Sequence, residues 1–413
     1  MLRLMFLGDR IWGNSGYSRV MHNTCMDLKK LGHSIAHIPM GMAMRGGKFN
    51  YHGVLVYPSG SDPFGEDVAV QHYIDFKSDV LISVKDVWVF NDMPRWAINW
   101  CPMVPVDHSP VSPSVTARLH STFKNIAISR FGQKELKYKG VESSYIPHGV
   151  QTEIYRPLEE RRADCRRMFF FDPEEFVVGI VALNRARKMI PRMLRGYKQF
   201  LEWNPDVKSH LMLWTDVNPP ARASEEEQPI PGVADVGVNL LPEIMDLGLG
   251  EAVRWPDKKL IREGIPEWAG EDYRGGWDMV KLYNSFSVLL LCSGGEGFGL
   301  PLLEAQSCGT PVITSNIAAA PELVGSGLTV PCNDYIIFNT PGTRYGLADV
   351  DKMAEALSKI VNADPAKLGK KARGFAERFS WENVLNQYWK PFLSEVETEL
   401  KPLITSEGAK TWA

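Results

Sequence analysis

The chain has 413 residues, of which 44% are hydrophobic and 23% are charged, and its formal net charge is -3. A single hydrophobic core rarely grows to this size, so we expect two or three globular domains. The nearly neutral balance gives no indication of a general nucleic-acid binder, which is usually basic, although it leaves room for a local basic patch.

The first part of the chain has the pattern of a doubly wound domain. The apolar residues 2–7 predict a buried strand, and a glycine-rich loop follows over residues 8–16. Residues 17–31 have helical periodicity and end at Gly32, where a left-handed cap is expected. A strand, a helix and a second strand in this order indicate a parallel sheet. Further strands are predicted at residues 34–39, 80–84, 103–106, 126–129 and 144–147.

A linker and a charged segment follow this domain. Residues 146–157 contain the prolines and the glycine of a turn, so the first domain is predicted to end near residue 160. The run 159–167 is charged and predicts a solvated helix. Its four arginines (161, 162, 166 and 167) can also contact nucleic acid, but an exposed surface is the simpler interpretation.

A second α/β pattern occupies residues 161–385. Strands are predicted at residues 176–182, 209–215, 287–292 and 311–314, and helices at 190–203, 278–285, 302–307, 349–361 and 365–379. The loops 217–236 and 255–276 are long enough to be functional or mobile. Residues 386–413 form a last helix and tail that can pack back on the N-terminal domain. The predicted fold is therefore α/β, with two doubly wound domains facing across a cleft.

The most informative segment begins at Cys292 and reads Cys-Ser-Gly-Gly-Glu-Gly-Phe-Gly-Leu-Pro-Leu-Leu-Glu-Ala. A buried strand ends at Cys292, four glycines let the backbone approach a ligand, and Pro301 suits the start of a helix. The free N–H groups of that helix suit a diphosphate. Glu296 in the loop and Glu304 in the expected first helical turn can accept hydrogen bonds from sugar hydroxyls. This combination predicts a nucleotide sugar as ligand.

A plainer interpretation explains part of this segment. A carboxylate near the start of a helix complements the helix dipole, and glycines permit tight turns. That interpretation accounts for Glu304 alone and leaves Glu296 and the density of glycines unexplained.

The spacing of Glu296 and Glu304, within Glu-Gly-Phe-Gly-Leu-Pro-x-x-Glu-Ala, resembles the signature of the GT4 family of retaining glycosyltransferases. Other segments also resemble that family, and together they cover nearly the whole chain. They are residues 13–32, 146–150, Tyr283-Asn284, 321–324 and 379–381. The resemblance implies the GT-B fold, with residues 1–160 as the acceptor-side Rossmann-like domain and residues 161–385 as the nucleotide-sugar domain.

The resemblance also implies roles for individual residues. Glu304 would bind the ribose of the donor, and Glu296, as a catalytic residue, would contact the transferred sugar. The backbone of the donor-binding residues Gly297, Phe298, Gly299 and Leu300 would bind sugar and phosphate oxygens.

A basic pair early in the second domain would hold the diphosphate. Lys188 matches the lysine of that pair, whereas Leu183 stands where the family carries an arginine. Either Arg185 or Arg187 would then take the place of that arginine, and a plain surface cluster is the alternative.

Two further positions belong to the expected site. The turn Gly13-Asn-Ser-Gly16 can place amides near the donor phosphates, with Gly16 as the donor-binding residue, or near the acceptor, and a plain tight turn explains it equally well. It is not a nicotinamide fingerprint. His108 follows a predicted strand and is the candidate for the histidine that family members often carry near the donor sugar. A satisfied structural histidine explains His108 equally well. Tyr283 and Trp255 can lie near the nucleoside, although an aromatic core is the default for both.

The expected activity is a retaining, metal-independent transfer of a sugar, with a hexose expected, from a nucleoside-diphosphate donor of the UDP-glucose type to a hydroxyl acceptor. No cofactor and no metal ligands are predicted. The acceptor (a glycan, a lipid, a small molecule or a modified base) and the oligomeric state stay open. The alternatives are transfer to a modified nucleic-acid base, a nucleotide-sugar epimerase, and a non-catalytic nucleotide-sugar binder.

The expected location is the cytoplasm, with the protein either free or peripheral to a membrane. The six cysteines are scattered without a Cys-x-x-Cys pair, which indicates a reducing compartment. The first apolar run ends at Asp9 and is too short for a signal peptide. We find no segment near the roughly 20 apolar residues that a transmembrane helix needs.

Overall fold

The computed structural model describes residues 1–13, 15–41, 46–158, 162–219, 237–256, 279–338 and 342–405. Contacts divide the chain into two units. Unit 1 contains residues 1–105, 113–149 and 381–413, and unit 2 contains residues 106–112 and 150–380. The limits of these two units differ from the domain boundaries that the sequence predicts at residues 160 and 385. Those boundaries stay predictions. Most of the predicted loops 217–236 and 255–276 lies outside the described residues.

Unit 1 is built on a largely parallel sheet of order β3-β4-β2-β1-β5-β6-β7-β8, in which only the β3–β4 pair is antiparallel among the described strands. Its strands are β1 (Arg3–Gly8), β2 (Ser34–Pro39), β3 (Phe49–Tyr51), β4 (Val54–Val56), β5 (Val80–Val84), β6 (Trp100–Val104), β7 (Ile126–Ala127) and β8 (Ser144–Tyr145). Its helices are α1 (Gly16–Lys30), α2 (Glu66–Phe76), α3 (Pro113–Thr116), α4 (Arg130–Tyr138), α13 (Trp381–Val384) and α14 (Lys390–Thr405), with short 3-10 turns η1 (Val87–Val89) and η2 (Met93–Arg95). A π-helical segment, η9 (Leu385–Trp389), lies between α13 and α14.

The first βαβ unit is confirmed in detail. β1 pairs in parallel with β2, from Arg3 opposite Ser34 to Gly8 opposite Pro39. The side chain of Ser15 caps α1 by accepting a hydrogen bond from the Ser18 N–H. Gly32 follows the helix with a φ of 92°, the left-handed conformation that glycine adopts at little cost.

Unit 2 contains a second parallel sheet of order β11-β10-β9-β12-β13-β14 and an antiparallel hairpin, β15–β16. Its strands are β9 (Phe176–Val181), β10 (Ser209–Trp214), β11 (Val253–Arg254), β12 (Val288–Leu291), β13 (Val312–Ser315), β14 (Gly327–Val330), β15 (Cys332–Phe338) and β16 (Thr343–Ala348). Its helices are α5 (Arg162–Met168), α6 (Ile190–Trp203), α7 (Leu241–Asp246), α9 (Met279–Ser285), α10 (Leu300–Ser307), α11 (Val350–Val361) and α12 (Pro365–Ala376), with turns η4 (Ala186–Lys188), η7 (Ala320–Leu323) and η8 (Glu377–Phe379).

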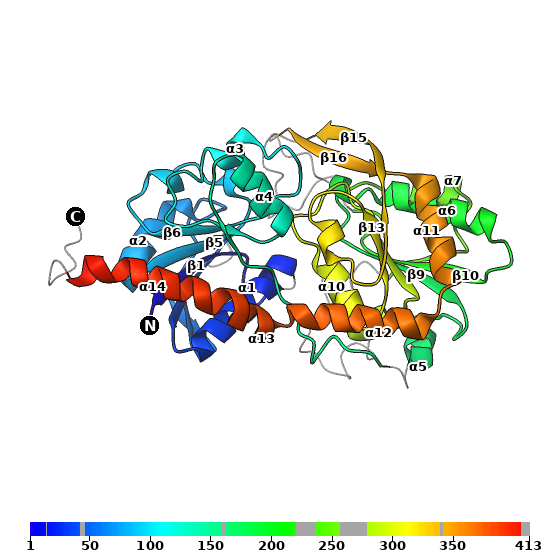
Figure 1. The fold of residues 1–413 in the computed structure, drawn as a ribbon, viewed down its shortest axis with the longest axis horizontal. Coiled ribbons are helices and arrows are strands. Elements are labelled where there is room, and N and C mark those ends of the chain that lie inside the picture. Colours follow the sequence, from blue (N-terminus) through cyan, green and yellow to red (C-terminus); the bar gives the residue numbers. More distant parts are fainter. Residues whose placement is uncertain are drawn as a thin grey trace. The chain divides into compact units, whose positions relative to one another are not determined.

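Helices of unit 2 pack on its sheet to form one core. Figure 1 shows α6 beside α11, with α7 next to α6, and α10 beside α12. The buried apolar side chains of α6 and α11 join those of β9, β10 and β12 in a single cluster, which includes Met193, Tyr197 and Leu357. The predicted doubly wound architecture is thereby confirmed for this unit.

The prediction for the arginine-rich segment is wrong in one respect. α5 is not simply a solvated helix, because Arg162 donates to the Phe286 carbonyl and Arg166 donates to the Ser285 carbonyl and to the Ser287 hydroxyl. These arginines bind two backbone carbonyls and one side-chain hydroxyl just before β12, whereas Arg167 remains exposed and pairs with Asp164. The planar guanidinium presents several donors at once, so a single arginine of α5 can bind several oxygens of the segment before β12. Arg161 lies outside the described residues.

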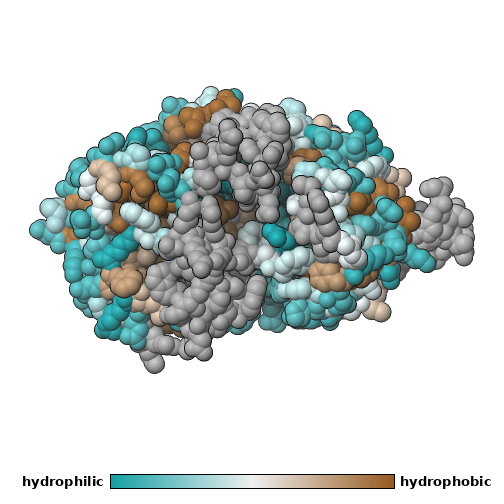
Figure 2. Space-filling model, turned by 180° about the vertical axis from the view of Figure 1, so that it is seen from behind, coloured by the Kyte–Doolittle hydropathy of each residue, from teal (hydrophilic) through white to brown (hydrophobic). Residues whose placement is uncertain are grey.

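No helix among the described residues is long and apolar enough to cross a membrane. On the face shown in Figure 2, hydrophobic residues form separate patches between hydrophilic ones.

We predict opposite effects of alanine at two helical glycines. Gly374→Ala in α12 should raise the unfolding free energy by about 0.5–1 kcal/mol, because a Cβ there meets open space and the unfolded chain loses freedom. Gly196→Ala in α6 should lower it by about 1–3 kcal/mol, because a Cβ would lie 2.8 Å from the Met353 Cβ of α11. Chemical denaturation measures both. Equal stability of the two variants would contradict the packing of α6 on α11.

Candidate functional site

The candidate site lies where the strand order of the unit 2 sheet reverses. From β9 the chain proceeds to β10 on one side, and β12 later pairs with the other side of β9. Open parallel sheets bind ligands at the carboxyl ends of the two strands that flank such a reversal. In this chain those ends carry residues 182–189, which follow β9, and residues 292–299, which follow β12.

The two loops are joined by hydrogen bonds and charge. The Gly294 N–H donates to the Arg187 carbonyl at 2.8 Å. The Lys188 Nζ lies 2.5 Å from the Glu296 Oε1, and the Arg187 Nη1 lies 3.6 Å from the Glu296 Oε2. Arg187 also donates to the Gly295 carbonyl at 3.2 Å. The structure thus brings together three of the predicted site residues: Arg187, Lys188 and Glu296.

Glu296 is ionised despite its burial. Its side chain is only 7% exposed, and burial alone would raise the pKa. The charges of Lys188 and Arg187, together with hydrogen bonds to the carboxylate, outweigh burial and lower the pKa to about 2. A negative carboxylate between two cations is therefore fixed at the carboxyl edge of the sheet.

The backbone around Gly294 and Gly295 is enclosed on several sides. A Cβ on Gly294 would lie 2.8 Å from the Tyr345 Cβ and 2.9 Å from the Met189 Cε. A Cβ on Gly295 would lie 2.2 Å from the Asp107 carbonyl oxygen. The Gly346 N–H of β16 also donates to the Gly294 carbonyl at 2.8 Å. These contacts, rather than turn geometry alone, require glycine at both positions.

Helix α10 begins earlier than predicted. Gly299 precedes it with a φ of 110°, and Leu300 and Pro301 are its first two residues. Glu304 is therefore the fifth residue and lies in the second turn, so its predicted place in the first turn is wrong. Because the dipole effect is largest within the first turn, the plainer dipole interpretation of Glu304 loses support.

Glu304 is buried and bonded to an aromatic hydroxyl. It is 4% exposed, and the Tyr283 hydroxyl donates to its Oε2 at 2.6 Å. Tyr283 lies fully in the core, as the default interpretation expected. Trp255 is partly buried against the core of unit 2.

The remaining motif residues differ in exposure. Phe298 is 5% exposed and contacts the Phe379 ring, so its side chain is committed to packing. Leu183, which stands at the position of the expected arginine, is 64% exposed. Arg185 is exposed and precedes η4, where its carbonyl accepts from the Lys188 N–H. The donor-binding roles of Gly297, Phe298, Gly299, Leu300 and Arg185 stay predictions.

His108 belongs to unit 2, because residues 106–112 group with that unit. Its Nδ1 lies 2.7 Å from the Asp107 Oδ1, and its Nε2 accepts from the Ser112 N–H at 3.2 Å. The tautomer with a proton on Nδ1 satisfies both contacts. This geometry favours a satisfied structural histidine, and the catalytic role of His108 stays a prediction. Gly16 is the first residue of α1 in unit 1.

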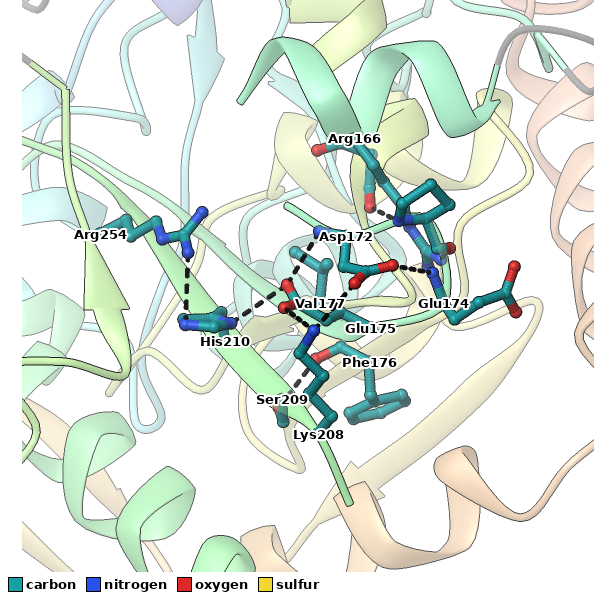
Figure 3. A network of polar contacts seen from close by, with 12 residues as sticks. Arg166, Asp172, Glu174, Glu175, Phe176, Val177, Lys208, Ser209, His210 and Arg254 are labelled. Carbon is teal, nitrogen blue, oxygen red and sulfur yellow. Dashed lines mark hydrogen bonds and ion pairs between the residues drawn. The ribbon is translucent and has the colours of Figure 1, made fainter. Parts of the chain in front are cut away.

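A second charged cluster lies at the opposite, amino ends of β9 and β10 (Figure 3). Lys208 pairs with Asp172 at 2.9 Å and with Glu175 at 3.3 Å. Glu175 also lies 3.1 Å from the His210 Nδ1, and Arg254 lies 3.4 Å from the His210 Nε2. Opposite charges pair within this cluster, although His210 Nδ1 and Arg254 Nη1 make no hydrogen bond among the described atoms. Because its charges pair with one another, we assign the cluster to stability and not to ligand binding.

Sequence reasoning missed the hairpin β15–β16 and its contact with the donor loop. Tyr345 and Gly346 of β16 touch Gly294, yet neither residue belongs to a recognisable motif. A local signal did exist, because residues 335–338 (Tyr-Ile-Ile-Phe) and 343–345 (Thr-Arg-Tyr) are rich in β-branched and aromatic types on the two sides of Pro341-Gly342, as is typical of a hairpin.

We predict that Glu296→Gln lowers the unfolding free energy mainly near neutral pH. A carboxyl whose pKa falls from 4.5 to about 2 on folding contributes roughly 3 kcal/mol above pH 4.5. That contribution is lost as the pH falls from 4.5 toward 2. The unfolding free energies of the wild type and of the Glu296→Gln variant should therefore become more similar over this range. Urea unfolding of both proteins, at neutral pH and near pH 3, measures this difference in unfolding free energy.

Glu355→Gln is the matched control. Hydrogen bonds and charge from Lys352 and Lys359 also lower the Glu355 pKa to about 2, but this carboxylate is exposed on α11. Solvent screens exposed pairs, so the Glu355 variant should change stability much less. An equal loss in both variants, or a Glu296→Gln difference that does not narrow with pH, would contradict the buried ion pair.

Comparison with known proteins agrees with this geometry. Residues 258–363 match the family model for glycosyl transferases group 1. The D-inositol 3-phosphate glycosyltransferase of Saccharomonospora viridis is 25% identical over 241 residues, which make up 57% of this chain and 46% of that relative. The chain thus spans about half the length of this curated relative.

Solved structures share the fold across nearly the whole chain. The sucrose-phosphate synthase of Thermosynechococcus elongatus superposes with a TM-score of 0.71 at 17% identity, covering 97% of this chain and 100% of that one. Anabaena HepE in complex with UDP-glucose superposes with a TM-score of 0.66 at 16% identity, covering 95% and 100%. The predicted resemblance is therefore confirmed: the chain is similar to the group 1 glycosyltransferases and has their GT-B fold of two Rossmann-like domains.

Proposed function

We propose that this protein is a glycosyltransferase that moves a hexose from a nucleoside-diphosphate sugar to a hydroxyl acceptor, with retention at the anomeric carbon and without a metal ion. The observation that carries the proposal is the joining of Lys188, Arg187 and Glu296 at the point where the sheet order reverses, beside the glycine loop that leads into α10. Cations and backbone N–H groups suit a diphosphate, and carboxylates suit hydroxyls.

The chemical step divides among the groups of this site. The bond between the anomeric carbon and the phosphate oxygen breaks, while the acceptor oxygen bonds to that carbon on the same face. The acceptor proton passes to the departing diphosphate. Lys188 and the N–H groups that start α10 would stabilise the negative charge that grows on the leaving group. Glu296 would accept a hydrogen bond from the transferred sugar, and its charge would favour an oxocarbenium-like transition state.

UDP-glucose is the first donor to test, because a structural neighbour was crystallised with UDP-glucose. Isothermal titration of UDP, GDP, ADP and their glucose conjugates would identify the base and the sugar. Release of the nucleoside diphosphate in the presence of candidate glycan, lipid and small-molecule acceptors would then show transfer. Binding without release of product would favour a non-catalytic binder, and no binding of any nucleotide would overturn the proposal.

We predict that Lys188→Ala weakens binding of the nucleoside diphosphate about 10- to 100-fold, because a charge-assisted hydrogen bond to phosphate is lost. Binding of the corresponding nucleoside, which has no phosphate, should change much less. Isothermal titration of both ligands separates loss of a phosphate contact from general disturbance of the site.

Lys352→Ala is the matched control for this substitution. Lys352 lies exposed on α11 and pairs with Glu355, so its removal should leave nucleotide affinity unchanged. An unchanged dissociation constant for the diphosphate in Lys188→Ala would remove Lys188 from the proposed site.

A further inference from the structure

The carboxylate of Glu304 is held by a tyrosine from another helix. Tyr283 lies in α9, and Glu304 lies in α10. The Tyr283 hydroxyl donates to the Glu304 Oε2 at 2.6 Å, a length typical of a hydroxyl bonded to a charged oxygen. Both side chains are buried, with exposed fractions of 0% and 4%, so water competes little for this hydrogen bond.

The tyrosine itself is fixed from several directions. The Tyr155 and Phe286 rings each lie 6.1 Å from its ring, in edge-on arrangements. The Thr310 hydroxyl donates to the Tyr283 carbonyl at 2.8 Å. Thr310 follows α10 and is 1% exposed. The same short helix is thus tied to Tyr283 by Glu304 within it and by Thr310 just beyond its end.

We propose that Tyr283 is a positioning residue for the donor nucleotide, which orients the Glu304 carboxylate toward the ribose hydroxyls. This inference rests on the proposed function and on the ribose-binding role that the family resemblance implies for Glu304. A carboxylate offers about four acceptor positions, and the hydrogen bond from Tyr283 takes one of them and restricts the rotation of the group. Without the hydroxyl, the carboxylate loses one hydrogen bond that sets its direction.

The experiment compares ribose with deoxyribose. Dissociation constants of UDP and 2′-deoxy-UDP are measured by isothermal titration for wild type and Tyr283→Phe, or with the GDP or ADP pair if the wild type binds that base. Phenylalanine keeps the ring and its packing. We expect Tyr283→Phe to weaken UDP about tenfold and 2′-deoxy-UDP about threefold or less, because the lost orientation matters most where both hydroxyls bind.

Two further variants separate positioning from general stability. Tyr197→Phe removes another buried hydroxyl of unit 2, which bonds to Ser209 at 3.1 Å within the core, and it should not change the preference for ribose. Glu304→Gln should reduce that preference by itself, and adding Tyr283→Phe to it should have little further effect. Such non-additivity is expected when two residues act through one interaction.

The outcomes distinguish failure of the inference from failure of the proposed function. If the wild type binds none of the three nucleoside diphosphates, the proposed function falls, and the role of Tyr283 with it. If the wild type prefers ribose and Glu304→Gln loses that preference, while Tyr283→Phe weakens both nucleotides equally, only the role of Tyr283 is overturned. Thermal melting of each variant confirms that the protein tested is folded.

Discussion

The buried ion pair between Glu296 and Lys188 is the interaction on which the rest of the candidate site depends. It joins the loop after β9 to the loop after β12, strands that are neighbours in the sheet. Removing two charges from water is costly, and the cost is recovered only when both partners and their hydrogen bonds are present. The loops are therefore held in one arrangement before a ligand arrives, and such preorganised charge is what catalysis of a charge-separating step requires.

The two carboxylates of the motif are held by different means. Cations surround Glu296, whereas a neutral hydroxyl holds Glu304. The first arrangement fixes an ionised group beside the place proposed for the diphosphate and the transferred sugar. The second sets a direction for the Glu304 carboxylate, which suits the role proposed for Tyr283 in recognition of an uncharged diol. The two carboxylates near the N-terminus of α10 can in this way contact the two ends of the proposed nucleotide sugar.

The sequence predicted the parts of this structure in which local pattern and tertiary packing agree. α6 has the predicted bounds, because its apolar spacing matches the face that it buries, and Gly32 has the expected positive φ. The start of α10 was placed two residues late, because Leu300 and Pro301 follow a glycine run that resembles loop. The roles of Arg162, Tyr345 and Asp107 were beyond local pattern, since each depends on a partner more than 50 residues away in the chain. For Tyr283 the sequence predicts burial in the core, but it does not predict the hydrogen bond to Glu304.

The crowding around Gly294 and Gly295 has a consequence for how relatives of this protein can diverge. Neighbouring side chains and a carbonyl oxygen occupy the space that any larger residue would need at these positions. Donor preference therefore has little room to evolve through the loop backbone. It can evolve through exposed residues at its margin, such as Leu183, where a change of side chain meets no such barrier. Leu183 itself stands where the family resemblance implies an arginine, so the chain departs from the family pattern at an exposed position and not at a crowded one.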